Sequence, residues 1–297
     1  MKPINIAAGL CLLAAACARE EPAGAETTAP VETAEEASDG GGPSIRLYTL
    51  DCGRIEMLDL SVFDIGGAYD GRQNSAVDTC FLIRHPQGDL LWDAGLPDSL
   101  HDVEGGVTNG PFALSMPKTL LGQLAELGLA PEDIEYFSIS HSHFDHLGNG
   151  GAFAGSTFIV HEAERAHMFR DEARADAQTF PAYSALEEAE TITFTDEHDV
   201  FGDGSVRIIS TPGHTPGHSV LLVDLESAGP VLLSGDLYHL AEAREKRTVP
   251  RFNTDVEETL RSMDKFEALA AETGAMVVIQ HEDDDYARLP KPPKYLD

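Results

Sequence analysis

Three imidazoles and a carboxylate fall within six consecutive positions of the stretch SHSHFDH, residues 140–146. His141 and His143 alternate around a serine, so in an extended turn both imidazoles can point the same way. Asp145 and His146 follow directly, and adjacent side chains of this kind cannot easily surround one ion. They can serve two ions held close together. The stretch therefore predicts a site for two metal ions.

Further candidate ligands follow strand-like runs elsewhere in the chain. His214 comes after a Pro-Gly turn, Asp236 stands on a glycine turn, and His281 ends the run MVVIQH. Side chains at the ends of neighbouring strands can converge at one sheet edge, and a carboxylate such as Asp236 can bridge two cations. A lone histidine at a strand end is more often structural, but the company of other ligands favours metal binding by His281. His218 repeats the spacing of His214, and we expect it to support the site rather than bind an ion.

Such a pair of ions points to hydrolysis. Two cations about 3.5–4 Å apart lower the pKa of a shared water and hold hydroxide at neutral pH. That hydroxide can attack a carbonyl carbon, while the cations stabilise the developing oxyanion and the leaving group. Mixed imidazole and carboxylate ligands suit zinc, cobalt, iron or manganese, and we expect two divalent ions, with zinc as their identity.

The segments that must position these residues alternate short strand-like runs with helices from Ile45 onward. A hairpin is predicted around the turn PQGD, and a leucine-faced helix ends near Gly128. A later helix is expected to begin at Thr254, with Glu257 completing a capping box. Residues 45–297 are therefore expected to form one mixed α/β layered domain.

The first 44 residues differ from that domain. Residues 1–17 have one lysine, an apolar run and a small-residue ending before Cys17, which is typical of a signal peptide with a lipobox-like end. A plain cleaved signal and a buried N-terminal helix are the alternatives. Residues 18–44 are rich in Ala, Glu, Thr, Pro and Gly, which predicts a flexible acidic tether. We expect an exported, periplasmic protein that a lipid on Cys17 anchors to the membrane.

The charge of the chain limits the kinds of partner it can bind, and two cysteines leave their pairing open. The chain has a formal net charge of −31, and residues 45–297 account for −26 of it. A domain this acidic should repel nucleic acid and anionic membranes, so a small-molecule substrate is expected, with membrane contact only through the anchor. Cys52 and Cys80 remain in the domain, either as a disulfide or as two buried thiols.

The motifs in this order resemble the metallo-β-lactamase superfamily of dinuclear hydrolases, over about residues 45–297. The resemblance implies an α/β fold, an αββα sandwich of two mixed β-sheets flanked by helices, with the site at one edge of the packed sheets. It also implies two ligand groups with Asp236 bridging them. The first is His141, His143 and His214, and the second is Asp145, His146 and His281.

The branch of the superfamily follows from finer features. True β-lactamases of the superfamily generally lack a bridging aspartate at the position of Asp236. The segments GRIEMLDLSVF, FLIRHPQGDLLWDAGLP and QHEDDDYARLPKPPKYLD look like the acyl-homoserine lactonase branch. That branch often has a tyrosine three positions after the aspartate, contacting the lactone carbonyl, whereas this chain has His239 there and Tyr238 one position earlier. The candidate catalytic residues are therefore Asp145, Tyr238 and His239, with core packing as the alternative for Tyr238.

The resemblance implies a metal-dependent hydrolase that opens lactone rings, N-acyl-homoserine lactones first, and so quenches quorum signals. The alternatives are a periplasmic metallo-β-lactamase, a thioesterase of glyoxalase type, and a lipoprotein that binds metal without catalysis. Residues 96–118 form a long glycine-rich stretch, in which Phe112 and Met116 are expected to line a pocket for an acyl chain. An ordinary surface loop is the alternative for this stretch.

Overall fold

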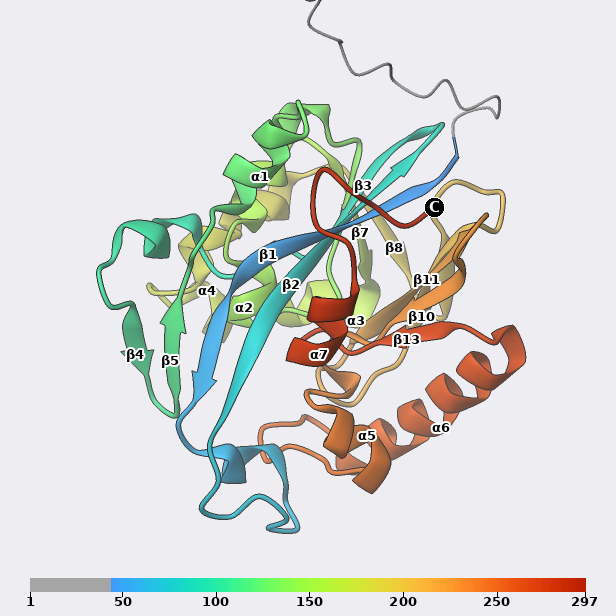
Figure 1. The fold of residues 1–297 in the computed structure, drawn as a ribbon. Helices are drawn as coiled ribbons and strands as arrows, with labels where there is room; N and C mark the ends of the chain where they lie inside the picture. Colours follow the sequence, from blue (N-terminus) through green and yellow to red (C-terminus); the bar gives the residue numbers. More distant parts are fainter. Residues whose placement is uncertain (1–43) are drawn as a thin grey trace, which may run out of the picture. The chain divides into compact units, whose positions relative to one another are not determined.

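The computed structural model describes residues 44–297. The predicted signal, the lipidation of Cys17 and all of the predicted tether except Ser44 lie outside the described residues. Two β-sheets pack face to face in the described part, with helices on both outer faces (Figure 1). Among the helices of this part, none is both long and apolar enough to cross a lipid bilayer.

The larger sheet has eight strands in the order β4-β5-β1-β2-β3-β6-β7-β8. The long strands β1 and β2 pair antiparallel, whereas β3, β6, β7 and β8 run parallel to one another. The strands are β1 (Arg46–Met57), β2 (Asn74–His85), β3 (Gly88–Trp92), β4 (Val107–Asn109), β5 (Phe112–Ser115), β6 (Tyr136–Ser138), β7 (Thr157–His161) and β8 (Thr191–Phe194).

The smaller sheet has five strands in the order β13-β12-β11-β10-β9. Because β11 is antiparallel to both β10 and β12, and β13 is parallel to β12, the strands β10, β12 and β13 all run in one direction. Their carboxyl ends therefore lie at one edge. The strands are β9 (Glu197–Asp199), β10 (Val206–Ser210), β11 (Ser219–Leu225), β12 (Gly229–Leu233) and β13 (Met276–Val278).

Strands in both sheets are apolar on both faces. Phe81 and Ile83 of β2 point into the layer between the sheets, where they share an apolar cluster with Leu221 and Val223 of β11. The residues between them in sequence point outward, because side chains alternate along a strand. Each sheet buries one face against the other sheet and its other face against helices. Strands that are buried on both faces have sequences that are continuous apolar runs.

Helices supply those outer layers. On the larger sheet, Leu120 and Leu124 of α1 pack against the outward faces of β1, β2 and β6. On the smaller sheet, Met263 and Phe266 of α6 pack against β11. The α-helices are α1 (Leu120–Glu126), α2 (Phe144–Leu147), α3 (Glu162–Met168), α4 (Asp171–Arg174), α5 (Ala241–Lys246), α6 (Val256–Thr273) and α7 (Asp283–Arg288). The short 3₁₀ helices are η1 (Leu60–Phe63), η2 (Asp98–Asp102), η3 (Pro131–Asp133), η4 (Gly150–Phe153), η5 (Phe180–Ala182), η6 (Ser184–Glu188) and η7 (Gly235–Leu237). The predicted αββα sandwich is confirmed.

The start of α6 differs from the prediction. Asp255, not Thr254, is the N-cap, and its side chain accepts a hydrogen bond from the backbone N–H of Glu258. The Thr254 hydroxyl instead donates to the carbonyl of His214. The predicted capping box is therefore wrong, because the threonine is used to hold the turn that carries His214.

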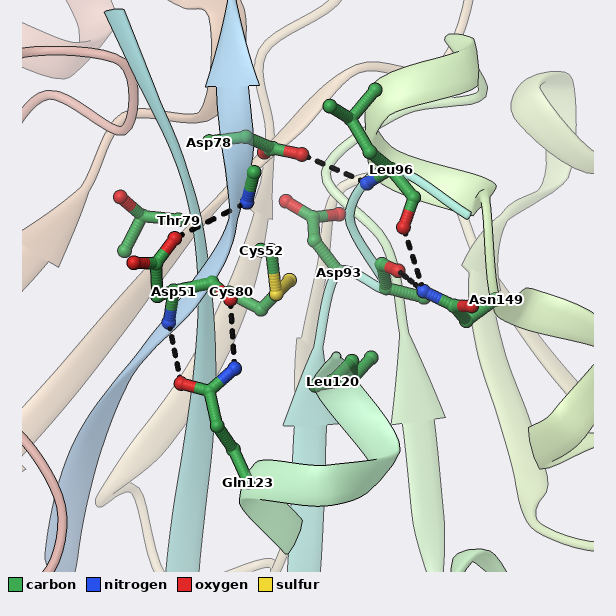
Figure 2. The surroundings of a disulfide bond; sticks show 12 residues. Asp51, Cys52, Asp78, Thr79, Cys80, Asp93, Leu96, Leu120, Gln123 and Asn149 are labelled. Atoms are coloured by element: carbon green, nitrogen blue, oxygen red, sulfur yellow. Dashed lines mark hydrogen bonds between the residues drawn. A yellow bond between two sulfur atoms is a disulfide. The ribbon is translucent and has the colours of Figure 1, made fainter. Parts of the chain in front are cut away.

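Cys52 and Cys80 form a disulfide, which answers the question that the sequence left open (Figure 2). Cys52 lies at the register shift between Asp51 and Gly53 of β1, and Cys80 is on the neighbouring strand β2. The Gln123 side chain of α1 spans this point, accepting from the Asp51 N–H and donating to the Asp51 carbonyl. The disulfide and Gln123 together fasten the irregular part of β1 to its neighbours.

Candidate metal centre

All seven predicted metal ligands follow the carboxyl ends of strands and meet at one edge of the sandwich. The residues from His141 to His146 follow β6, His214 follows β10, Asp236 lies in η7 after β12, and His281 follows β13. The ligand atoms form two clusters, each with all of its atoms within 4.8 Å of one another. Strands from both sheets therefore contribute to one site.

The first ligand group is a triangle of imidazole nitrogens from His141, His143 and His214. Nε2 of His141 lies 2.9 Å from Nδ1 of His143. Nε2 of His214 lies 3.1 Å from each of those two atoms. Nitrogens at the corners of a tetrahedron around zinc, about 2.0–2.1 Å from the ion, are about 3.3 Å apart. The spacing of the triangle fits one such ion.

The second ligand group consists of Asp145, His146 and His281. Nε2 of His146 and Nε2 of His281 are 3.4 Å apart. The Asp145 carboxylate faces both, with Oδ2 3.8 Å from His281 Nε2 and Oδ1 4.0 Å from His146 Nε2. Two imidazoles and a carboxylate make a second donor set of the kind that divalent transition metals bind.

The Asp236 carboxylate lies between the two groups. Its Oδ2 is 3.5 Å from Nε2 of both His141 and His214. Its Oδ1 is 3.0 Å from Nε2 of His281 and 3.3 Å from Nε2 of His146. Within the described chain, buried Oδ1 has no hydrogen bond of good geometry. An orphaned buried carboxylate oxygen is costly, and a bound cation would satisfy it, so the residues present fit a pair of cations.

Hydrogen bonds on the far side of the rings orient three of the imidazoles. Where Nδ1 donates to an acceptor, the lone pair of Nε2 is left pointing toward the centre. These contacts are His146 Nδ1 to Asp93 Oδ2 at 3.0 Å, His281 Nδ1 to the Val77 carbonyl at 2.9 Å, and His214 Nδ1 to Asn253 Oδ1 at 2.9 Å.

Electrostatics separate the two groups. Burial lowers the pKa of His141 and of His143 well below the ordinary histidine value, so both rings are neutral ligands. Burial also opposes charge on His146 and His281, but the surrounding carboxylates together outweigh it. Asp236, Asp93 and Asp145 hold the pKa of His146 well above its usual range, and Asp236 and Asp145 raise that of His281 to about 9. The carboxylates that favour protons on these two rings equally favour a metal cation beside them.

Asp93 is a site residue that the sequence reasoning missed. Its Oδ1 accepts from the Ser140 N–H at 2.6 Å, and its Oδ2 accepts from Gln280 Nε2 at 2.7 Å as well as from His146. It directly follows β3, the same strand-end position that singled out Asp236 and His281. This place directly after a strand is the feature of the sequence that could have identified Asp93.

The ring of His218 forms hydrogen bonds to the backbone. Its Nε2 accepts a hydrogen bond from the backbone N–H of Asp236 at 3.0 Å, and its Nδ1 lies 3.1 Å from the Thr211 carbonyl. Burial lowers its pKa to about 3, so the ring is neutral. Both ring nitrogens are engaged, so His218 positions the Asp236 carboxylate and has no lone pair to offer an ion.

The two candidates for substrate contact point to different places. The Tyr238 hydroxyl donates to Glu267 Oε1 at 3.0 Å, and the ring packs edge-on against Phe266 of α6. His239 turns the other way, with Nε2 3.0 Å from Asp236 Oδ2. Neighbouring residues alternate sides where the backbone is extended, as it is at Tyr238. Tyr238 therefore points away from the ligand groups, which favours packing over substrate contact for this residue.

A cavity of about 260 Å³ is lined by His143 of the first ligand group, by Asp145 and His281 of the second, and by Asp236. Its walls are mainly apolar, and His239 lines it beside the carboxylates. The apolar lining residues are Ile55, Met57, Phe63, Phe112, Phe144 and Phe252. Phe112 lies where it was expected. Met116 does not, because its side chain is 4 % exposed and packs in the core beside Leu96 and Leu114.

Comparison with known proteins agrees with the fold. Residues 77–281 match the metallo-β-lactamase superfamily, and the chain belongs to it. It is a metal-dependent hydrolase of that superfamily.

Two relatives illustrate the likeness. The N-acyl homoserine lactonase AttM of Azorhizobium caulinodans is 30 % identical over 262 residues, 85 % of this chain and 99 % of the relative. The N-acyl homoserine lactonase AiiA of Bacillus thuringiensis subsp. kurstaki is 29 % identical over 244 residues, 80 % of this chain and 93 % of the relative.

Solved structures give the same picture. An N-acyl homoserine lactone hydrolase with N-hexanoyl-L-homoserine bound at its catalytic metal centre matches with a TM-score of 0.72 and 26 % identity, over 85 % of this chain and 99 % of that chain. A B. thuringiensis AiiA mutant with N-decanoyl-L-homoserine at its active site matches with a TM-score of 0.73 and 26 % identity, again over 85 % and 99 %.

Proposed function

We propose that this chain is a dinuclear lactonase that opens N-acyl-homoserine lactones. The observation that carries the proposal is the Asp236 carboxylate, with one oxygen toward each ligand group beside an apolar cavity. The relatives named N-acyl homoserine lactonases support the same substrate class.

His141, His143 and His214 would hold one ion, Asp145, His146 and His281 the other, and Asp236 would contact both. Two divalent ions bound there, zinc in this proposal, would supply hydroxide at neutral pH and polarise the lactone carbonyl. The neutral rings of His141 and His143 present lone pairs without first losing a proton.

Other residues bind and orient the substrate. The apolar walls around Phe63 and Phe112 suit an acyl chain, and they exclude water from the reacting end. His239 presents an imidazole at the inner wall, where it would hydrogen-bond a substrate oxygen. The Asp145 carboxylate also lines the cavity, so it can take a proton during attack and return it to the leaving alkoxide.

Export to the periplasm is part of the proposal. The Cys52–Cys80 disulfide supports it, because disulfides persist in oxidising compartments and are rare in the cytosol. A lipid on Cys17 stays a prediction from the sequence.

The test of function is proton release from a medium-chain acyl-homoserine lactone by the metal-loaded full-length protein, with a β-lactam assayed in parallel. Rapid lactone opening that EDTA abolishes and added zinc restores is the expected result. Turnover of the β-lactam alone would reject the lactonase proposal in favour of a β-lactamase. Two tightly bound ions without turnover of any activated ester would instead favour a non-catalytic metal-binding protein.

A further inference from the structure

A buried carboxylate outside the ligand set joins the two turns that carry the first ligand group. Glu164 of α3 is 1 % exposed, and each of its carboxylate oxygens accepts two hydrogen bonds. Oε1 accepts from the Ser142 N–H at 2.7 Å and from the Ser142 hydroxyl at 2.5 Å. Oε2 accepts from the Thr215 hydroxyl at 2.7 Å and from the Gly217 N–H at 2.8 Å.

The donors stand next to metal ligands in the chain. Ser142 separates His141 from His143, and Thr215 directly follows His214. One carboxylate therefore binds the chain neighbours of all three histidines of the first ligand group. The turn at 141–143 follows a strand of the larger sheet, whereas the turn at 214–217 follows β10 of the smaller sheet. Glu164 thus connects the two sheets at the point where their histidines must meet.

Four hydrogen-bond donors surround the Glu164 carboxylate in place of a cation. Within residues 44–297, no lysine, arginine or histidine nitrogen forms an ion pair with it within 4.0 Å. A buried carboxylate without a counter-cation is tolerable only when hydrogen bonds replace its hydration. Moving either turn away would leave one of the two carboxylate oxygens without hydrogen-bond donors. Because a buried oxygen without donors costs free energy, the carboxylate holds both turns in place.

Close packing at Gly217 points to the same role. A Cβ at this position would lie 2.4 Å from the backbone nitrogen of Glu164 and 2.7 Å from its Cβ. Real atoms cannot approach so closely, so only glycine lets the 214–217 turn sit directly on the first turn of α3. The contact between the turn and Glu164 is thus built into the backbone as well as into the side chain.

The second ligand group has separate supports. Asp93 accepts from His146, and the Val77 carbonyl orients His281. None of the four hydrogen bonds of Glu164 reaches Asp145, His146 or His281. Loss of Glu164 therefore leaves the hydrogen bonds that orient the second ligand group in place.

We propose that Glu164 is a positioning residue that presets the histidine triangle for the ion of the first ligand group. This inference rests on the proposed dinuclear centre. Loss of Glu164 weakens one of the two ions and leaves the other in place. A residue that only stabilised the fold would lower the melting temperature without discriminating between them.

The substitution Glu164→Gln tests this without changing the size of the side chain. Each carboxylate oxygen faces one backbone N–H, of Ser142 or of Gly217, and a backbone N–H cannot accept a hydrogen bond. Whichever way the amide is turned, its NH₂ group opposes one of these donors. The glutamine therefore breaks the connection on one side in either orientation.

The matched control is Glu162→Gln. Glu162 lies in the same helix, is exposed, and loses the same charge. Zinc affinities of both variants and of the wild type would be measured by competition with a chromophoric chelator, and cobalt-loaded spectra would report the ligand geometry of each ion. We expect Glu164→Gln to bind one ion about 10–100-fold more weakly and the other unchanged, with the control like the wild type. The variants His214→Ala and His281→Ala each remove a ligand from one group, so they show which measured affinity belongs to which ion. The ion that Glu164→Gln weakens should be the one that His214→Ala loses.

The proposal is overturned if folded Glu164→Gln binds both zinc ions as tightly as the wild type does. It is also overturned if the variant binds both ions more weakly by the same factor. Should Glu164→Gln fail to fold, Thr215→Val removes one donor and keeps the carboxylate, and it must weaken the same ion selectively or the proposal falls. Neither readout uses lactone turnover. Absence of lactonase activity would therefore reject the proposed substrate and leave this test intact, whereas a wild type that binds fewer than two ions would reject the dinuclear centre itself.

Discussion

Oδ2 of Asp93 accepts a hydrogen bond from Nδ1 of His146 over 3.0 Å, and the aspartate makes this contact from a left-handed backbone with φ of 63°. A residue other than glycine pays about 1–2 kcal/mol for that conformation. The same carboxylate also holds Ser140, which precedes His141, and Gln280, which precedes His281. The strain is thus retained where one side chain aligns three segments of the centre.

Replacing Asp93 with asparagine should weaken the ion of the second ligand group. The amide would oppose the Ser140 N–H in one orientation and the donors of Gln280 and His146 in the other, so at least one donor would be left unsatisfied. We expect roughly 10–100-fold weaker binding of one ion and a loss of about 1–3 kcal/mol in unfolding free energy. Chelator competition and chemical denaturation measure the two effects. Asp224→Asn, on an exposed position of β11, is the control, and equal behaviour of the two variants would contradict the role of Asp93.

Asp236→Ala should lose at least one of two bound ions, since its two oxygens face different ligand groups. Metal content after dialysis of the folded variant checks this, and lactone turnover should fall with it. Retention of both ions together with full activity would show that the carboxylate does not bridge. Removing both ions from the wild type with EDTA should abolish turnover reversibly.

Phe112→Ala should reduce kcat/KM selectively for long-chain lactones. The ring lines the cavity, and loss of about 1.4 kcal/mol of apolar contact corresponds to about a tenfold effect. Turnover of a series of acyl chain lengths measures it. Met116→Ala serves as the comparison, because that side chain is in the core and should cost about 2–5 kcal/mol of stability with no dependence on chain length. Equal losses for short and long chains in Phe112→Ala would reject the acyl-pocket role.

Tyr238→Phe and His239→Ala should separate packing from substrate contact. Loss of the hydroxyl that donates to Glu267 should cost about 1 kcal/mol of stability and leave lactone turnover intact. Loss of the imidazole in the cavity wall should lower kcat/KM at least about tenfold, an expectation scaled to one lost hydrogen bond to substrate. If the tyrosine variant were the one that lost activity, the assignment of the two residues would be reversed.

Reduction of the disulfide should lower the melting temperature. Cys52 and Cys80 are 28 residues apart, and a cross-link closing a loop of this length restricts the unfolded chain by about 3–4 kcal/mol. For a domain of this size the shift is on the order of 10 °C. Thermal unfolding with and without a reductant measures it, with alkylation and mass spectrometry to count free thiols. The Cys52→Ser/Cys80→Ser variant should not respond to the reductant, and a wild type that also fails to respond would contradict a stabilising role.

Much of the centre could be predicted from the sequence, because its ligands are chemically distinctive and follow strands. The motif from His141 to His146, with His214, Asp236 and His281, named every side chain that the structure gathers. Asp93 and Glu164 were not predicted. Asp93 could have been noticed only by its place directly after a strand, and Glu164 lies within a helix with no such sign. The partners of both residues come from segments distant in the chain.

The sequence by itself determined the elements and the donor set, because side-chain chemistry and the periodicity of apolar residues are local properties. The tertiary structure alone decided the rest. It turned His239 toward Asp236 and Tyr238 toward Glu267, and it brought Cys52 and Cys80 together. Which way a side chain faces depends on the register and packing of strands that meet only in the folded chain, so no local pattern could specify it.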